Sequence, residues 1–283
     1  MESVLVLGAT GFIGGTVLTA LLAGLPPHVQ VTSLIRGGGD DYLSKEARLF
    51  AATSRANFSV HHLAGTNAII DGLKLRAKTS AKQPILVHVS ADCCPDPSQP
   101  HRDVDLAVAQ ADTEGSIKTV TIVPPLVYGL GLGQFKTHSS QVPGLIRRTL
   151  KRRKAEYIGR GLGIWNHVHV QDLAQLFVLV VNKLMLDSNS VPSGTKGYLF
   201  AESGEISWKD LSQNVADAIG RVDAQLLDSS NAVPLNQQES EIQFPNPLGR
   251  AYHSSNSRSR AETPLLKDLE REVAVQLVYF RLD

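Results

Sequence analysis

The chain has little of what disulfide-rich or membrane-spanning proteins depend on. Its 283 residues include two cysteines, Cys93 and Cys94, which are adjacent. A disulfide between neighbours is strained, so we expect no disulfide framework and a reducing compartment. No apolar run approaches the roughly 20 residues that cross a bilayer, and no basic stretch precedes the first apolar residues. We therefore expect a cytoplasmic protein with no membrane partner.

An excess of charge of one sign is missing too. Lys and Arg number 28 against 27 Asp and Glu, which gives a net charge of +1 and no reason to expect nucleic acid as a partner. The sequence lacks the P-loop, the G-x-S-x-G elbow and the Cys-x-x-Cys pair. These absences argue against an NTPase, an α/β-hydrolase and a zinc module.

The clearest feature present is a strand, a glycine-rich turn, a helix and a second strand in that order. "SVLVL" is a continuous apolar run, which is typical of a strand buried on both faces of a parallel sheet. Residues 13–24 have helical periodicity, and residues 29–36 predict the second strand. This βαβ order predicts an α/β protein with a Rossmann-type, doubly wound parallel sheet.

The turn itself, "GATGFIGG", has glycines spaced G-x-x-G-x-x-G. Gly8 permits the tight turn, Gly11 lets the backbone approach a pyrophosphate, and Gly14 lets the helix pack closely on the sheet. The N–H groups at the helix start would then face the phosphates. The alternative is a plain βα turn without a ligand.

The residue that ends the second strand bears on the choice of cofactor. Arg36 stands where an acidic residue would accept hydrogen bonds from the ribose of NAD, and an arginine suits the 2′-phosphate of NADP. We therefore expect NADP, with NAD less favoured because Asp40 and Asp41 follow closely. The alternative for Arg36 is a solvated strand end.

Periodicity and capping signals predict the remaining elements. Helices are expected at 42–53, 66–78, 102–111, 145–153, 173–183 after an Asp172 cap, 208–220 after Ser207, and 265–277. Strands are expected at 58–65, 84–90, 119–129 and 198–203, with a further short strand that contains His167 and His169. Residues 130–144 and 228–264 are rich in turn-forming residues and predict loops.

Several phrases together resemble one family. "VLGATGFIGG", "PILVHVSA", "IVPPLVYG" and "WNHVHVQDLAQLF" are similar to successive landmarks of the extended and atypical short-chain dehydrogenase/reductases, and more narrowly of the fungal NAD-dependent epimerase/dehydratase-like proteins. The resemblance implies a Rossmann domain at 1–135 that also uses about 165–185. It implies a small α+β substrate lobe at 136–164 and 186–283.

The resemblance also implies an activity and a site. The protein would be an NAD(P)-dependent oxidoreductase or epimerase that acts on a carbonyl or hydroxyl of a small-molecule substrate, and it needs no metal. Ser90 would be the catalytic serine, with Tyr128, His101 and Lys136 as candidate proton donors. The cofactor would contact Gly8, Thr10, Gly11, Phe12, Ile13, Gly14, Arg36, Pro125, Leu126 and Val127.

This chain departs from the family at the catalytic pair. The family uses Tyr-x-x-x-Lys, in which lysine lowers the pKa of tyrosine, and no tyrosine here has lysine four residues later. A helix and a strand expected after Arg36 are also missing, so the chain looks shortened. The alternatives are therefore a non-catalytic NAD(P)-binding regulator, similar to the NmrA-like redox sensors, or an inactive shortened homologue. A homodimer is one expectation for the oligomeric state.

Three other groups of residues have two interpretations each. His167 and His169 with Asp172 could hold a metal, but they equally fit a strand that leads into a helix cap. His101 and Asp105 are four residues apart and could pair on a helix, with His101 as a substitute acid/base, or they could form a surface helix start. "RRTLKRRK", residues 147–154, could hold an anionic substrate or form a solvated helix end.

Overall fold

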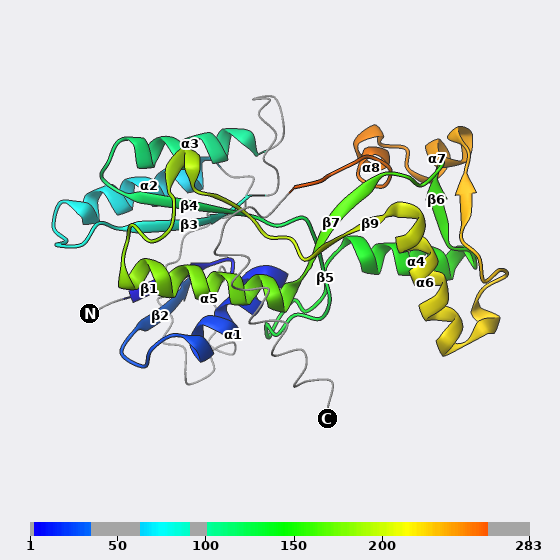
Figure 1. Ribbon diagram of the computed structural model, residues 1–283, viewed down its shortest axis with the longest axis horizontal. Helices are drawn as coiled ribbons and strands as arrows, with labels where there is room; N and C mark the ends of the chain where they lie inside the picture. Colours follow the sequence, from blue (N-terminus) through cyan, green and yellow to red (C-terminus); the bar gives the residue numbers. More distant parts are fainter. Residues whose placement is uncertain (1–2, 35–62, 91–100, 260–283) are drawn as a thin grey trace.

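The computed structural model describes residues 3–34, 63–90 and 101–259. Figure 1 shows these elements in two groups, a sheet with helices on both faces at the left and a smaller lobe at the right. The alternation of strands and helices along the chain puts apolar stripes of the helices against both faces of the sheet, which is the α/β arrangement expected from the sequence.

The first group begins with the predicted βαβ unit. Strand β1 (Ser3–Leu7) pairs in parallel with β2 (Gln30–Leu34), and helix α1 (Phe12–Gly24) connects them. The register places Leu7 opposite Leu34. The carboxyl ends of both strands therefore lie at the same edge as the glycine turn.

A second parallel sheet completes this group. Strand β4 (Lys118–Val123) lies between β3 (Ile85–Val89) and β8 (Tyr198–Phe200). Helices α2 (Leu63–Ala77) and α3 (Arg102–Thr113) pack together on one face, and α1 packs against α5 (Val170–Leu186) on the other, as Figure 1 shows.

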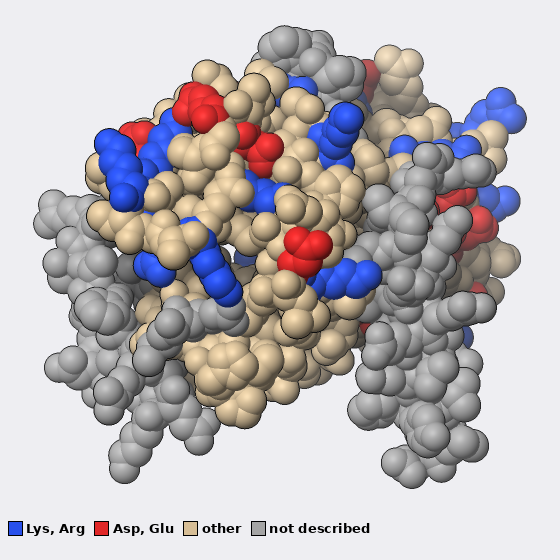
Figure 2. Space-filling view, turned by 60° about the vertical axis from the view of Figure 1, so that its left-hand side comes forward, with Lys and Arg blue, Asp and Glu red and all other residues tan. Residues whose placement is uncertain are grey.

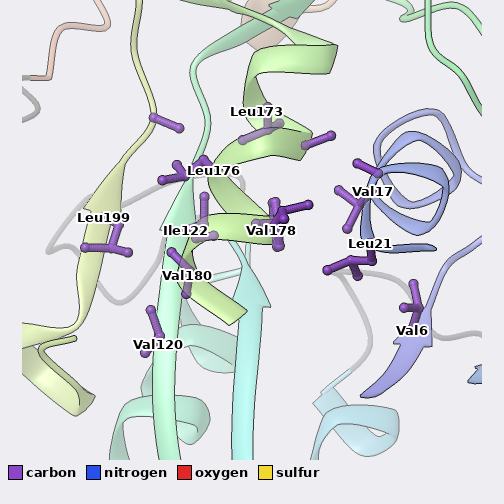
Figure 3. Packing of buried hydrophobic residues seen from close by; sticks show 14 of the residues in the cluster. Val6, Val17, Leu21, Val120, Ile122, Leu173, Leu176, Val178, Val180 and Leu199 are labelled. Carbon is purple, nitrogen blue, oxygen red and sulfur yellow. The ribbon is translucent and has the colours of Figure 1, made fainter. Parts of the chain in front are cut away.

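The main core lies between α1, α5 and the sheet (Figure 3). Each buried aliphatic side chain contributes about 1.5–3 kcal/mol relative to exposure. The residues labelled in Figure 3 come from five elements and all are at most 8% exposed: Val6, Val17, Leu21, Val120, Ile122, Leu173, Leu176, Val178, Val180 and Leu199.

One expectation about β1 is wrong. Leu5 is 61% exposed, whereas Val6 is 8% exposed, so the strand is buried on one face and not on both. Among the strands that the structure describes, β1 is hydrogen-bonded to β2 alone, and this pair is separate from the β3–β4–β8 sheet.

Within the described residues, the smaller lobe contains short strands and several helices. Strand β7 (Ile164–His169) pairs with β5 (Leu126–Tyr128) and antiparallel with β9 (Gly204–Ser207), and β6 (Glu156–Ile158) pairs with β10 (Val233–Leu235). The helices are α4 (Gln141–Arg152), α6 (Trp208–Val222), α7 (Gln237–Gln243) and α8 (Pro247–Ala251). Its own buried cluster consists of Leu145, Ala155, Val215, Ala216, Ile219 and Leu227.

The start of α5 differs from the sequence prediction. The helix begins at Val170, and the cap is His169, whose Nδ1 accepts a hydrogen bond from the backbone N–H of Gln171. Asp172 lies in the first helical turn instead of preceding the helix. The expectation that Asp172 caps a helix at 173–183 is therefore wrong, although an acidic residue still occupies the favourable end of the helix dipole.

Prolines explain two further differences. The predicted strand at 119–129 is two strands in different sheets, because Pro124 and Pro125 have no N–H to donate to a ladder. Helix α4 starts at Gln141 and not at 145, since Pro143 falls in the first turn, where a backbone N–H needs no helical partner.

The region 228–264 was expected to be loop, but it contains β10, α7 and α8. Helix α7 begins with a capping box in which Asn236 and Glu239 satisfy each other's backbone N–H groups. By contrast, the helix that begins after Ser207 is confirmed, because the Ser207 hydroxyl accepts from the N–H of Asp210.

Several predictions lie outside the described residues, so the structure does not bear on them. They concern Arg36, Asp40, Asp41, Cys93, Cys94, the helices at 42–53 and 265–277, and the first part of the strand at 58–65. The last part of that strand, from Leu63, belongs to α2. Within 3–34, 63–90 and 101–259, no helix is both long and apolar enough to cross a membrane.

Candidate functional site

The glycine turn joins β1 to α1 in the geometry that a phosphate site needs. Gly8 has φ +74°, and its carbonyl oxygen accepts from Gly11 N–H at 2.8 Å. A Cβ at position 14 would lie 2.2 Å from the same oxygen, and one at position 11 would lie 3.1 Å from it. Gly14 therefore cannot carry a side chain without moving the turn.

The start of α1 is open to an anion. Its cap residue, Gly11, has no side chain, and the first turn contains no acidic residue. Within the described residues, no side chain caps the helix, so the first N–H groups and the positive end of the helix dipole are not compensated. Thr10, Phe12 and Ile13 lie in or beside this turn.

A loop from Gly129 to His138, called here the 129–138 loop, packs on the same helix. Its two sides are joined where Gly131 N–H donates to the Thr137 carbonyl at 2.8 Å. Leu132 N–H donates to Thr16 Oγ1 of α1 at 3.1 Å. A Cβ at position 133 would lie 2.8 Å from the Cα of Gly15, so the two backbones are in close contact. The 129–138 loop therefore lies against the first turns of α1, beside the glycine turn.

Ser90 lies directly after β3 and has no exposed surface. Its hydroxyl donates to Asp105 Oδ2 at 2.7 Å, and the other carboxylate oxygen lies 3.2 Å from His88 Nε2. A serine hydroxyl has one hydrogen to donate, and in this arrangement Asp105 takes it. The hydroxyl hydrogen of Ser90 is therefore directed at Asp105 and not at a substrate carbonyl, and the side chain has no exposed surface.

This arrangement also bears on His101. The structure pairs Asp105 with Ser90 and His88, and His101 is the cap residue of α3 with φ +73°. A positive φ is uncommon for a residue with a side chain. His101 adopts it at the amino end of α3.

Tyr128 ends β5, one residue after Val127. Its ring makes edge contacts with the imidazoles of His167 and His169, with centroids 5.5 and 5.3 Å apart. Burial, and to a lesser degree the Asp172 carboxylate, raises the pKa of Tyr128. The phenol therefore stays protonated at neutral pH, and the raised pKa makes it a weaker acid than an ordinary tyrosine.

The two histidines of β7 differ in their contacts. His169 caps α5 and lies over Gly129, where a Cβ would come 2.0 Å from its Nε2. His167 Nδ1 is buried without a hydrogen-bond partner, and burial lowers the pKa of His167. In the described residues, no three His, Cys, Asp or Glu side chains are placed to hold a metal ion.

The remaining predicted contacts come after β4, where Pro125 precedes β5 and Leu126 and Val127 begin it. Pro125 follows β4, and Leu126 and Val127 pair with β7. Val89 of β3 is opposite Ile122 of β4, so Ser90 and Pro125 both follow the carboxyl ends of neighbouring strands. Figure 1 shows these ends facing the smaller lobe. Ligands of doubly wound proteins bind at this edge.

Sequence reasoning missed the partner of Ser90 and the packing of the 129–138 loop. One signal for the first was present. Asp105 lies on the buried stripe of α3 beside Val104 and Val108, where an acidic residue needs a buried partner. No local signal indicates the contact between Gly15 and Gly133, because the two are far apart in sequence.

Comparison with known proteins finds relatives of part or most of the chain. Residues 98–190 match the NAD dependent epimerase/dehydratase family. Oxidase ucsJ from Acremonium sp is 24% identical over 270 residues, which covers 74% of this chain and 76% of that protein. Uncharacterized protein C2A9.02 from Schizosaccharomyces pombe is 32% identical over 89 residues, or 31% of this chain and 28% of that protein.

Solved structures share the fold. The dTDP-glucose 4,6-dehydratase of Bacillus anthracis in complex with NAD has a TM-score of 0.59 at 12% identity, covering 95% of this chain and 96% of that one. The Thermus thermophilus UDP-glucose 4-epimerase complex with NAD has a TM-score of 0.54 at 14% identity, covering 96% and 93%. The resemblance to the epimerase/dehydratase group and the Rossmann-type fold are thus confirmed.

Proposed function

We propose that this epimerase/dehydratase-like chain is an NAD(P)-dependent oxidoreductase that acts on a carbonyl or hydroxyl carbon of a small molecule. The observation that carries the proposal is the turn at Gly8–Gly14, because it combines close backbone packing with an uncapped helix start. Such a turn supplies free N–H groups to a pyrophosphate, and a side chain at position 11 would project toward the same space.

The proposed cofactor is NADP. Gly8, Gly11 and Gly14 would hold the pyrophosphate, and Val127 would lie beside the nicotinamide. The preference for NADP over NAD rests on Arg36, whose guanidinium suits a 2′-phosphate. Similar structures solved with NAD support a nicotinamide dinucleotide in general.

The dinucleotide, when bound, would supply or take up a hydride. Tyr128 would donate a proton to the substrate oxygen, since its phenol is protonated and lies one residue beyond the nicotinamide position. Ser90, which is fully buried and bonded to Asp105, would act as a positioning residue that holds the carboxyl end of β3 against α3. His101 is a second candidate acid at the amino end of α3.

A non-catalytic role is the second candidate, and the burial of Ser90 favours it. Ser90 has no exposed surface, and the Tyr-x-x-x-Lys pair is missing from the sequence. In that case the chain would bind the dinucleotide and use the bound state to bias an interaction with a partner.

Titration of the purified protein with NADPH and NADH, followed by fluorescence, tests the binding step. We expect NADPH to bind more tightly, and we expect Gly11→Val to weaken binding by about tenfold or more by blocking the pyrophosphate, a loss of about 1.4 kcal/mol. Gly72→Ala is the control, because a Cβ there meets no atom within 4 Å. Equal affinity of wild type and Gly11→Val, or no binding of either dinucleotide, would contradict the proposal.

Oxidation of NADPH in the presence of aldehydes and ketones separates the two functions. A catalytic chain turns over, and Tyr128→Phe slows it without changing the affinity for NADPH. Binding without turnover of any substrate in the panel supports the regulatory alternative.

A further inference from the structure

We propose that a basic groove at the outer end of the smaller lobe binds a phosphate-type oxyanion carried by a small molecule. The groove is formed by Arg147, Arg148, Lys151 and Arg152 of α4 with Gln243 of α7, and we call it the α4 groove. Its volume is about 310 Å³, and it is open to solvent. None of its lining residues is acidic.

The spacing of the four cations puts like charges side by side on α4, and Glu156 pairs with one of them, Arg152. Their positions, i, i+1, i+4 and i+5, place Arg147 near Lys151 and Arg148 near Arg152 on one side of the helix. Like charges at this spacing destabilise a helix. The helix dipole favours cations within the last turn only, which accounts for Lys151 and Arg152 but not for the pair before them.

Two of the guanidinium groups are already held in place. Arg148 lies 4.2 Å above the centre of the Phe244 ring, and Arg152 Nε donates to Glu156 at 2.6 Å. Burial, together with the charge of Arg152, lowers the pKa of Arg148 despite the opposing effect of Glu156. An arginine has five N–H donors, so both groups keep donors for a ligand. Because both side chains are already ordered, they lose less conformational entropy when a ligand binds.

The other two cations are exposed. In the part of the chain that the structure describes, the side chains of Arg147 and Lys151 form no hydrogen bond or ion pair. Planar guanidinium groups bind phosphate through paired N–H donors, and an ammonium group adds a point charge. The groove therefore combines two fixed donors with two adaptable ones.

The charge is local, which favours a small ligand over a nucleic acid. The net charge of the chain is +1. On the side of the α/β group that Figure 2 brings forward, blue basic and red acidic residues are interspersed, so the basic run of α4 does not extend over that face. A nucleic acid contacts phosphates along an extended basic surface. A small molecule with one or two phosphates matches a groove lined by five residues.

The α4 groove is separate from the dinucleotide site. Figure 1 shows the carboxyl end of α4 and α7 at the far end of the smaller lobe, away from β1 and α1. The inference therefore does not depend on the proposed function.

Pyrophosphate is the probe, titrated by calorimetry at constant ionic strength. The variant Arg147→Gln with Lys151→Gln removes two exposed charges from the groove. The control, Lys154→Gln with Arg160→Gln, removes two exposed charges that do not line it. We expect the groove variant to weaken pyrophosphate binding about tenfold or more and the control to change it less than about twofold, since charge-assisted hydrogen bonds are lost in the first case only.

Pyrophosphate could also enter the glycine turn, so the titration is repeated in Gly11→Val, where groove binding persists. The inference is overturned if both charge variants weaken binding equally, if wild type does not bind pyrophosphate at millimolar concentration, or if sulfate binds as well as pyrophosphate. It is also overturned if Arg147 and Lys151 are needed for binding a single-stranded oligonucleotide but not pyrophosphate.

Discussion

Asp105 is the residue whose environment most constrains the chemistry of the site. It is 1% exposed, and its two oxygens contact Ser90 and His88. A buried carboxylate needs such partners, because an unpaired one would lose its hydration without compensation. The contact also joins α3 to the end of β3, so one side chain fixes both Ser90 and the helix.

Asp105→Ala should therefore destabilise the fold. We expect the free energy of unfolding to fall by about 3 kcal/mol, because Ser90 and His88 lose a buried partner. Ser90→Ala should cost about 1–2 kcal/mol, and the double variant less than the sum of the two. Urea denaturation measures all three, with exposed Asp217→Ala as the control. Additive losses would show that the two side chains do not interact.

At this scale the sequence predicts local chemistry well. Gly8, Gly11 and Gly14 lie within one turn, so their spacing in the sequence predicts the geometry of that turn. The close approach of Gly14 to the backbone of Gly8 is confirmed. The role of Ser90 depends on Asp105, 15 residues later and across a segment with no periodic pattern. Its partner could be inferred only from the presence of an acidic residue on an apolar stripe.

At the scale of elements, the 129–138 loop connects β5 to α4 and packs on α1 beside the glycine turn. It continues β5, crosses α1 through Thr16 and Gly15, and leads into α4. Position 133 tolerates only glycine, since the backbone of α1 occupies the space of a side chain.

Gly133→Ala should push this loop away from α1. We expect a loss of stability of about 1–3 kcal/mol from overpacking, together with weaker NADPH binding. Gly144→Ala is the matched control, because a Cβ at that position in α4 meets no atom within 4 Å and alanine favours a helix by up to about 1 kcal/mol. Thermal melting of both variants is the measurement. If Gly133→Ala melts at or above the temperature of Gly144→Ala, the contact does not constrain the loop.

Helix starts could be predicted where the capping residue precedes the apolar pattern. Ser207 shows this, and Asn236 with Glu239 carries the same signal within a segment that we expected to be loop. The start of α5 could not be found in this way. Its cap is a histidine, and histidine caps are uncommon next to an aspartate that competes for the role.

For the whole molecule, stability should depend on pH through buried histidines. Burial lowers the pKa of both His167 and His253, so near pH 6 the unfolded chain binds more protons than the folded one. The contribution is fully present above the ordinary histidine pKa of about 6.5 and is lost as the pH falls below it. We expect the melting temperature to decrease between pH 7 and pH 5.

Other groups act outside this window. The raised pKa of Asp172 opposes the loss in more acidic solution, where the folded chain retains a proton more firmly. The raised pKa of Tyr128 lowers stability above about pH 10. His253→Gln should reduce the change in melting temperature between pH 7 and pH 5, and His138→Gln, at an exposed position, should not. Equal slopes in both variants would argue against the assignment to His253.

The order of strands and helices could be predicted from apolar periodicity, and with it the Rossmann-type fold. The arrangement of the sheets could not. The separation of β1 and β2 from β3, β4 and β8, and the exposure of Leu5, depend on which strands meet in space. An apolar run such as Ser3–Leu7 is the same for a strand with one neighbour or two.

Helix α1 is synthesised early, but Val17 and Leu21 pack against α5, which follows much later in the chain. On the ribosome, a nascent polypeptide that ends before α5 presents the apolar side of α1 to solvent or to a chaperone. The contact between α1 and α5 closes a long segment of the chain, and this closure costs conformational entropy before the contact can stabilise the fold. A nucleotide present during translation would therefore meet the residues of the glycine turn before α5 packs against α1.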